Sequence, residues 1–512
     1  MNDPQRTSAD GVAPAFGPAT IAAGDPRYES MLRGTNHRFA CKPDYVVVVT
    51  STEQVVAAVG EAVAAGKRVQ VRSGGHCFED FTANPDVEVL LDMSEMTAVG
   101  YDPAMRAFAI EPGARLRQVY SVLYKGWGVT VPAGEGTEVG FGGHLTGGGY
   151  GPLSRRYGAV VDYLYAVEVV VVGADGTARA VVATREPDDP NRDLWWAHTG
   201  GGGGTFGVAT RFWLRSPDSD SDDPRELLPK APTSWRQGYA VWPWPSLTEE
   251  SAIRLLRNFG EWFEANSAPD SRYAAMTGFL HGSHRDTHGL MVGASMDDDV
   301  PDAERLMTEF FAAIAEGVGV EPVMNVQQVN PWLYVSTYPG WGDTGGRDVR
   351  RIKIKAAMHR KALTDRQIAA IRAHLDRPEP VATQLILIGY GGRVNAVAPD
   401  ATATPQRDSV FKATYMATWA SEADDERMID PIRELYAEVY ADTGGVPGVD
   451  CRTDGSYINY PDADLADPRI NTSGVPWHTM YFKDNYPRLQ QIKKRYDPRE
   501  VFRHRLSVRP PD

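Results

Sequence analysis

The feature that most constrains this chain is a glycine-dense stretch, AGEGTEVGFGGHLTGGGYG, at residues 133–151. Nine of its nineteen residues are glycine, and a glycine inside a helix or strand costs about 0.5–1 kcal/mol relative to alanine. A chain tolerates this density where its backbone must turn with positive φ or lie directly against a ligand. Because consecutive N–H groups in such a loop form a concave anion site, the stretch predicts a loop that binds a pyrophosphate.

Two shorter glycine-rich loops accompany it, SGGHC at residues 73–77 and TGGGGGTFG at residues 199–207. Each stands directly beside a strand-like run. Flexible linkers need not do so, and compact domains rarely contain long structureless loops. No GxGxxG motif opens a helix after the first strand, and no GxxxxGK(S/T) motif occurs, which argues against Rossmann and P-loop nucleotide sites. We therefore expect ligand-binding loops of another kind.

His76 lies at the end of a predicted strand–helix–strand unit. Tyr45–Val49 is a continuous β-branched run, typical of a buried parallel strand. A valine-rich helical pattern follows and stops at Gly66, and Arg68–Val71 forms the returning strand. His76 is therefore expected just beyond the C-terminal end of a strand, where α/β sheets commonly bind ligands.

The rest of the chain divides where SPDSDSDDPRELLPKAP, residues 216–232, breaks the pattern. Before it, residues 106–134 predict a strand, a helix and a second strand. Asp175-Gly176 then turns a hairpin, and TFGVATRFWLRSP predicts a half-exposed strand. After residue 232, amphipathic helices alternate with strand-like runs such as TQLILIGYGG and FKATYMATWA. This alternation predicts an antiparallel sheet with helices over one face.

Charge and composition argue against several classes of protein. The 53 Lys and Arg against 67 Asp and Glu give a net charge of −14, which disfavours nucleic acid and anionic membrane surfaces as partners. No run approaches the roughly 18 apolar residues of a membrane span. Cys41, Cys77 and Cys451 are too few and too widely spaced for a disulfide framework or a CxxC metal site, so no metal is expected. The N-terminal residues show no signal-peptide pattern, so we expect a cytoplasmic protein.

Five motifs in order resemble those of a known family. They are PDYVVVVTSTEQVVAAV, VRSGGHCFED, GFGGHLTGGGYGPLSRRYG, WWAHTGGGGGTFGVAT and YINYPD followed by YFKDNYPRLQQIKKRYDP. Together, over about residues 30–507, they resemble FAD-linked oxidases with a PCMH-type FAD-binding domain, in the berberine-bridge-enzyme-like branch. Within that branch the chain is most similar to the hexose oxidases of teicoplanin-type glycopeptide biosynthesis. The resemblance implies a two-domain α+β flavoprotein of the PCMH/vanillyl-alcohol-oxidase type, with an antiparallel-sheet substrate domain covered by helices.

The resemblance also indicates which domain each part of the chain is expected to form. Residues 1–24 are expected to be a disordered tail, 25–218 the FAD-binding domain, 219–465 the substrate-binding domain, and 466–512 a C-terminal segment that returns to the FAD-binding domain.

In the family, the histidine of the SGGH loop is bonded covalently to the flavin, which by resemblance assigns that role to His76. Many relatives form a second bond from a cysteine whose position here is Gly136. FAD attached through His76 only is therefore expected. The other residues expected to contact FAD are Arg72, Ser73, Gly74, Gly75, Cys77, Gly136, Val139, Gly140, Gly142, Gly143, His144, Gly147, Tyr150, Gly151, Gly207, Val208 and Tyr460. For His144 itself, a structural role within its loop is favoured over a catalytic one.

The resemblance places the catalytic base at Tyr460, in YINYPD, with Tyr150 and Tyr457 as further catalytic candidates. Tyr457, Tyr150 or Arg393 could stabilise the phenolate. The implied reaction is hydride removal from an alcohol carbon, such as a sugar hydroxyl of a glycosylated natural product, with O2 as electron acceptor. The alternative is oxidative cyclisation or dehydrogenation of a polyketide or alkaloid. The expected partner is a small-molecule substrate, and the expected assembly is a monomer or homodimer.

Overall fold

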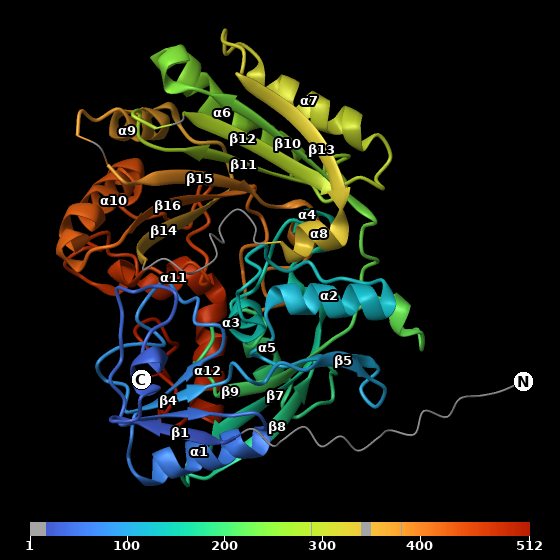
Figure 1. Cartoon of the computed structure of the whole chain (residues 1–512), viewed down its shortest axis with the longest axis vertical. Coiled ribbons are helices and arrows are strands. Elements are labelled where there is room, and N and C mark those ends of the chain that lie inside the picture. The colour runs from blue at the N-terminus through green and yellow to red at the C-terminus, as the bar shows by residue number, and fades with distance from the viewer. Residues whose placement is uncertain (1–16, 288, 339–349, 380, 512) are drawn as a thin grey trace, which may run out of the picture.

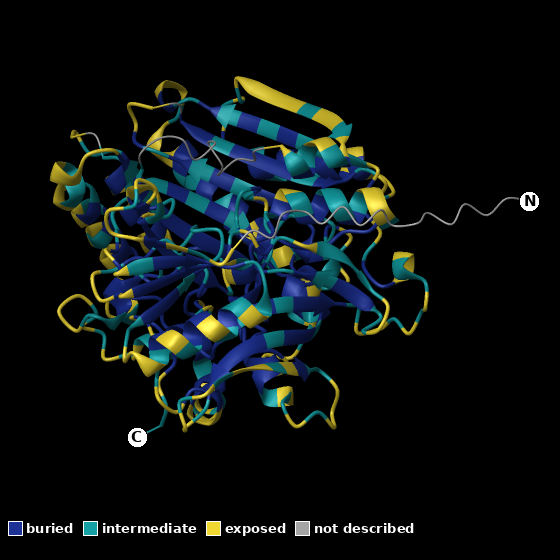
Figure 2. Ribbon diagram, turned by 60° about the horizontal axis from the view of Figure 1, so that its bottom comes forward, coloured by how far each residue is buried: buried dark blue, intermediate teal, exposed yellow. Residues whose placement is uncertain are grey.

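Three β-sheets form the framework of the computed structural model, which describes residues 17–287, 289–338, 350–379 and 381–511 (Figure 1). Two of the sheets lie in the lower half of the view and the seven-stranded sheet lies above them. Strands in the middle of the molecule are largely buried, and exposed residues lie on the outer helices and loops and on the edge strand β13 (Met324–Pro331) (Figure 2).

The four-stranded sheet contains the predicted strand–helix–strand unit. Its strands, in spatial order, are β1 (Ala19–Ala22), β2 (Tyr45–Val48), β4 (Val89–Asp92) and β3 (Val69–Arg72). β2 and β3 are both parallel to β4, which lies between them. Helix α1 (Thr52–Ala64) joins β2 to β3; Ser51 caps it by accepting the Gln54 N–H, and Gly66 ends it with φ +66°.

Strand β1 corrects one expectation. Ala19–Ala22 belongs to the segment predicted to be a disordered tail, yet it pairs with β2 in the antiparallel direction. Its Ile21 is buried against the apolar residues beneath the sheet, which explains why order begins before Asp25. Residues 1–16 of the predicted tail lie outside the described residues.

The five-stranded sheet is antiparallel. In spatial order its strands are β5 (Val99–Asp102), β6 (Ala107–Ile110), β9 (Val208–Leu214), β7 (Leu164–Val172) and β8 (Ala178–Thr184). The predicted hairpin over Asp175-Gly176 is confirmed as β7 and β8. β9 was expected to be half exposed, but it is mostly buried because it lies between β6 and β7.

A second correction concerns residues 129–132, which were predicted to be a strand after the helix of that segment. The helix is present as α2 (Leu116–Trp127), but Val129 makes only an isolated bridge to Lys230. The apolar character of Val129 and Val131 reflects burial in the main core rather than sheet pairing.

The seven-stranded sheet is antiparallel throughout. In spatial order its strands are β13 (Met324–Pro331), β10 (Ser234–Trp242), β12 (Leu290–Asp297), β11 (Met276–Gly282), β15 (Gln384–Gly389), β16 (Phe411–Trp419) and β14 (Arg351–His359). The predicted helices are present as α6 (Glu249–Asn266), α7 (Ala303–Ala315) and α9 (Asp365–Leu375), and α10 (Asp425–Val439) packs beside β14 and β16. In Figure 1, α6, α7 and α9 lie on the side of the sheet away from the lower half. The antiparallel sheet with helices over one face is confirmed.

Shorter helices connect these parts. They are α3 (Phe141–Thr146), α4 (Ser154–Tyr157), α5 (Arg192–Ala197), α8 (Trp332–Thr337), α11 (Trp477–Phe482) and α12 (Tyr486–Tyr496). Helix α12 packs against α5, so the C-terminal segment contacts the lower half of the molecule. No helix among the described residues combines the length and apolar character needed to cross a bilayer. The exact domain boundaries stay a prediction.

Candidate active site

The glycine-rich loops predicted from the sequence meet in space. The first follows β3, and the second contains α3. A Cβ at Gly74 would lie 2.3 Å from the backbone N of Gly140, so the two loops touch backbone to backbone. Ser73 Oγ donates to the carbonyl of Pro112 at 2.5 Å and fixes the first loop on the strand end. His76 follows two residues after Gly74 and is half-buried.

The third glycine loop packs on the second. The Gly202 N–H donates to the carbonyl of Thr146 at 3.0 Å, and a Cβ at Gly203 would lie 2.9 Å from Thr146 Oγ1. Gly207 has φ +146° and lies against β7, where a Cβ would approach Val170 O to 2.6 Å. Side chains at these positions would therefore separate the loops, which accounts for the glycine density.

Several of the predicted FAD contacts have partners within the protein. Arg72 forms a buried ion pair with Asp92 at 2.6 Å and donates to the carbonyls of Met31 and Arg33. Burial raises the pKa of the Cys77 thiol to about 12, so this thiol is protonated at neutral pH. Val208 is buried as the first residue of β9.

His144 has the surroundings of a structural histidine. Its Nε2 accepts the Gly134 N–H at 3.0 Å, and burial lowers the pKa of the imidazole to about 4. The ring is therefore neutral at pH 7 and joins the start of the glycine-dense loop to helix α3. Asn459 secures the same loop, because its Nδ2 donates to the His144 carbonyl at 2.8 Å and to the Tyr457 hydroxyl at 3.1 Å.

Four tyrosines, which we call the tyrosine cluster, gather beside these loops: Tyr150, Tyr390, Tyr457 and Tyr460. The Tyr150 ring lies 4.9 Å from that of Tyr390 and 5.4 Å from that of Tyr457. The Tyr457 and Tyr460 ring centroids are 6.0 Å apart. The Tyr390 hydroxyl donates to the Gln406 carbonyl, whereas the buried Tyr150 hydroxyl has no hydrogen-bond partner among the described residues.

Sequence reasoning missed Lys412, the cation of this cluster. It belongs to β16, and its Nζ lies 3.1 Å from the centroid of the Tyr460 ring and 5.2 Å from that of Tyr150. Within the described part of the chain, this buried Nζ has no hydrogen-bond partner. A lysine inside the otherwise apolar and hydroxyl-bearing run FKATYMATWA was the available signal. Arg393, by contrast, is exposed.

The electrostatics of the cluster favour neutral groups. Burial lowers the pKa of Lys412 well below its usual value, and Glu135 partly opposes that shift. Burial and the Glu135 carboxylate raise the pKa of Tyr460. Glu135 is exposed as a residue, yet many protein atoms surround its carboxyl, and this burial raises the pKa of the carboxyl.

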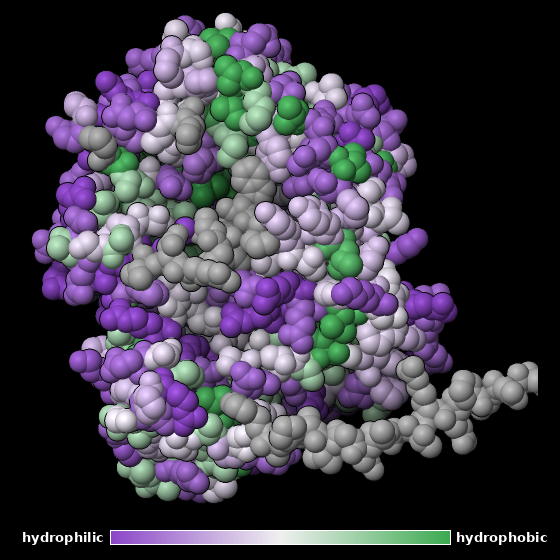
Figure 3. All heavy atoms as spheres, viewed as in Figure 1, coloured by the Kyte–Doolittle hydropathy of each residue, from purple (hydrophilic) through white to green (hydrophobic). Residues whose placement is uncertain are grey.

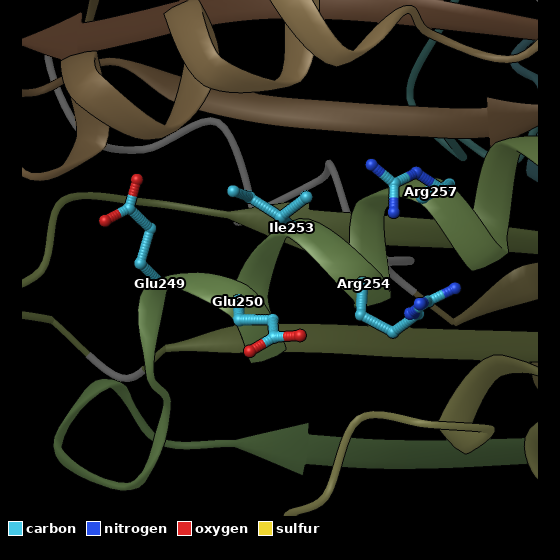
Figure 4. Close-up of a pocket in the computed structure, with 5 residues that line it drawn as sticks. All are labelled: Glu249, Glu250, Ile253, Arg254 and Arg257. Atoms are coloured by element: carbon cyan, nitrogen blue, oxygen red, sulfur yellow. The ribbon is translucent and has the colours of Figure 1, made fainter.

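Figures 3 and 4 show the surface of the molecule and a pocket on it. Hydrophilic side chains cover much of the face drawn in Figure 3. A depression lined by Glu249, Glu250, Ile253, Arg254 and Arg257 lies on α6 (Figure 4). All five residues belong to one helix on the far side of the seven-stranded sheet, away from the glycine loops. The tyrosine cluster is therefore the better candidate for chemistry.

Comparisons with known proteins agree with this geometry. Residues 43–181 match the model of an FAD binding domain, and residues 456–509 match that of the berberine and berberine-like family. Aclacinomycin-N/aclacinomycin-A oxidase of Streptomyces galilaeus is 52% identical over 488 residues, covering 95% of this chain and 89% of that protein. The chain belongs to the berberine-bridge-enzyme-like family of FAD-linked oxidases.

Other relatives of this oxidase are consistent with the assignment. The hexose oxidase of Chondrus crispus is 29% identical over 527 residues, covering 94% of this chain and 93% of that protein. A crystal structure of a glycopeptide hexose oxidase complexed with teicoplanin superposes with a TM-score of 0.92 at 50% identity, covering 97% of this chain and 99% of that one. The family, the two-domain α+β fold, the FAD cofactor and the oxidoreductase class predicted from the five motifs are confirmed.

Proposed function

We propose that this oxidase removes a hydride from an alcohol carbon, at a sugar hydroxyl of a glycosylated natural product, with O2 as the electron acceptor. The contact of Lys412 with the Tyr460 ring carries the proposal, because it places an amine that can hold a proton against the phenol that is proposed as the base. Two relatives with about half of their residues identical support the substrate class: one is named for aclacinomycin, and the other was solved with teicoplanin.

The described residues fit FAD. Neither Gly74 nor Gly140 places a side chain of its own between the two loops, so an extended dinucleotide could lie against their backbone. We propose that His76 holds the flavin covalently. Gly136 stands where a second linking cysteine would be, and Cys77 is held as a thiol by its raised pKa. These observations support attachment through His76 only. The glycine loops would hold the phosphates through backbone N–H groups.

Tyr460 takes the proton of the substrate hydroxyl. When bound, FAD supplies the hydride acceptor, which O2 reoxidises. Burial and Glu135 raise the pKa of the Tyr460 phenol, and with these two effects alone Tyr460 would be a poor base. Glu135 favours the protonated form of Lys412 against the effect of burial, and in that form the charge of Lys412 against the ring stabilises the phenolate and opposes this rise. Tyr150, whose hydroxyl is unpartnered within the described residues, is placed to orient the substrate oxygen.

The test is incubation with O2 and paired substrates, each a glycoside and its free aglycone, followed by mass spectrometry. The proposal predicts that only the glycoside changes, losing two hydrogens or converting a CH2OH group to a carboxylate, with H2O2 released. An isomeric, cyclised aglycone would instead support the berberine-type alternative.

A denaturing gel viewed under ultraviolet light tests the flavin link: fluorescence should stay with the wild-type protein and vanish in His76→Ala. A cytoplasmic location and a monomeric or homodimeric state remain proposals, which fractionation and light scattering test.

A further inference from the structure

Five buried charged side chains and the half-buried Arg433 form a cluster outside the tyrosine cluster. They are Lys353 and Lys355 of β14, Arg433 of α10, and the carboxylates Glu79, Asp462 and Asp464. Three positive and three negative charges balance. We call this set the buried charge cluster.

Lys353 joins two loops within this cluster. Its Nζ lies 3.0 Å from Glu79 Oε1 and 2.7 Å from Asp462 Oδ1, and all three side chains are at most 3% exposed. Glu79 comes three residues after His76, and Asp462 comes two residues after Tyr460. One ammonium group therefore binds both the loop that carries the proposed flavin link and the loop that carries the proposed base.

Neighbouring contacts reinforce this junction. Asn36 donates through Nδ2 to the carbonyls of Phe78 and Ile352, at 2.7 and 3.0 Å, and accepts the Ile352 N–H at 3.0 Å. The Phe78 ring in turn contacts the Tyr460 ring, with centroids 5.6 Å apart. The His76 loop, β14 and Tyr460 are thus connected beside Lys353 by both backbone and ring contacts.

The energetics point to a role beyond stability. Burial alone would lower the pKa of Lys353, but Asp462, Glu79 and Asp464 raise it above its usual value, so the ammonium is charged. Replacing a buried ion pair by well-packed apolar residues is often neutral or stabilising. What apolar residues cannot supply is directional contact of one group with two separate loops.

We propose that Lys353 is a positioning residue for the oxidation, which fixes the His76 loop against the Tyr460 loop and so sets the flavin relative to the base. The inference rests on the proposed function. Lys355 pairs with Asp462 and Asp464, as Lys353 does, but among the described residues no ion pair joins Lys355 to Glu79. This difference between two neighbouring lysines gives a matched control.

The test compares two charge-balanced double variants of the holoenzyme. Lys353→Met with Glu79→Gln removes the link between the loops. Lys355→Met with Asp464→Asn removes the same number of charges but leaves Lys353 bound to Glu79 and Asp462. Each is measured for melting temperature, covalent flavin fraction, and flavin reduction by substrate in anaerobic stopped flow. The link variant should reduce its flavin about 10–100-fold more slowly than the control at similar melting temperature, because small misplacements have effects of this size. Its KM should change little.

Equal reduction rates and equal covalent flavin fractions in the two variants would overturn the inference. If the link variant does not fold, Glu79→Asp decides, because it keeps all six charges and shortens the bridge by one methylene. A wild-type reduction rate in Glu79→Asp would overturn the inference, and slowed reduction supports it. Failure of the proposed function would appear separately, as wild-type protein without covalent flavin or without oxidation of any glycoside.

Discussion

Lys412 Nζ lies 3.1 Å from the centroid of the Tyr460 ring, although 47 residues separate the two in the sequence. β16 supplies the lysine, and the loop before α11 supplies the tyrosine. The contact is a cation–π geometry rather than a hydrogen bond to the phenol oxygen, so its effect on Tyr460 is electrostatic. A positive charge there favours the phenolate, and a neutral amine leaves the phenol protonated.

Lys412→Met should therefore slow flavin reduction at neutral pH. The rate should still increase with pH, but the increase should occur at a higher pH than in the wild type. The sign follows from the charge: without the ammonium the pKa of the Tyr460 phenol increases, so the base becomes available only at higher pH. Removing a buried amine that has no hydrogen-bond partner among the described residues should also raise the melting temperature. Lys412→Arg keeps the charge and should retain more activity. A pH profile that is the same in Lys412→Met and wild type contradicts this role.

Tyr460→Phe should lower the rate of flavin reduction about 10²–10⁴-fold, the usual effect of losing a general base. The flavin spectrum and covalent attachment should stay unchanged, because the phenol is not part of the proposed link. Tyr390→Phe is the comparison, since its hydroxyl donates to the Gln406 carbonyl and its loss should have a smaller effect. If Tyr460→Phe reduces its flavin at the wild-type rate, Tyr460 only lines the site and Tyr150 becomes the next candidate.

Sequence predicted the features that are encoded locally. The glycine loops can be recognised because close contacts between backbones, such as that of Gly74 with Gly140, require glycine, and glycines can be read directly from the sequence. The hairpin of β7 and β8 and the helices α6, α7 and α9 follow from periodicity over a few turns or strands.

Convergence between distant segments could not be predicted in this way. Lys353 and Glu79 are 274 positions apart, and nothing in either local sequence indicates the other. The same limit applies to Lys412 and Tyr460: alternation in FKATYMATWA predicts a strand, but not which side chains oppose it. At residues 129–132 the sequence predicted a strand that is absent. Residues that are buried without a strand partner show the same apolar pattern as a buried strand.

Buried neutral histidines should make the fold sensitive to acid. Burial lowers the pKa of His198 to about 4, and its Nδ1 bonds the Leu194 carbonyl at 2.8 Å. Because the unfolded chain has a histidine pKa near 6.5, it binds more protons than the folded chain between about pH 4 and 6.5. Stability is therefore complete above this window and falls as pH decreases through it, by on the order of 1 kcal/mol per pH unit for each such histidine.

His198→Asn tests this dependence. The asparagine amide can replace the donor to Leu194, but it does not titrate. Urea unfolding followed by tryptophan fluorescence at pH 7, 6 and 5 should show a smaller loss of stability with acid in the variant, whatever its stability at pH 7. His37→Asn, at a less buried histidine, is the comparison. An unchanged slope in His198→Asn would mean that this ring is already charged in the folded state.

Gly136→Cys should allow a second attachment of the flavin, but only after local repacking. A Cβ at Gly136 would lie 2.9 Å from Val139 Cγ2, so the new side chain collides with a branched residue that cannot easily move away. Val139→Ala removes the obstacle. The informative protein is Gly136→Cys with Val139→Ala and His76→Ala, in which only the new thiol can hold the flavin. We expect fluorescence to stay with this protein on a denaturing gel. The matched control, Gly136→Ala with Val139→Ala and His76→Ala, should lose its flavin on denaturation. If the cysteine variant binds FAD but releases it like the control, Gly136 is not beside the reactive edge of the flavin, and the placement of the cofactor argued from the three glycine loops must be revised.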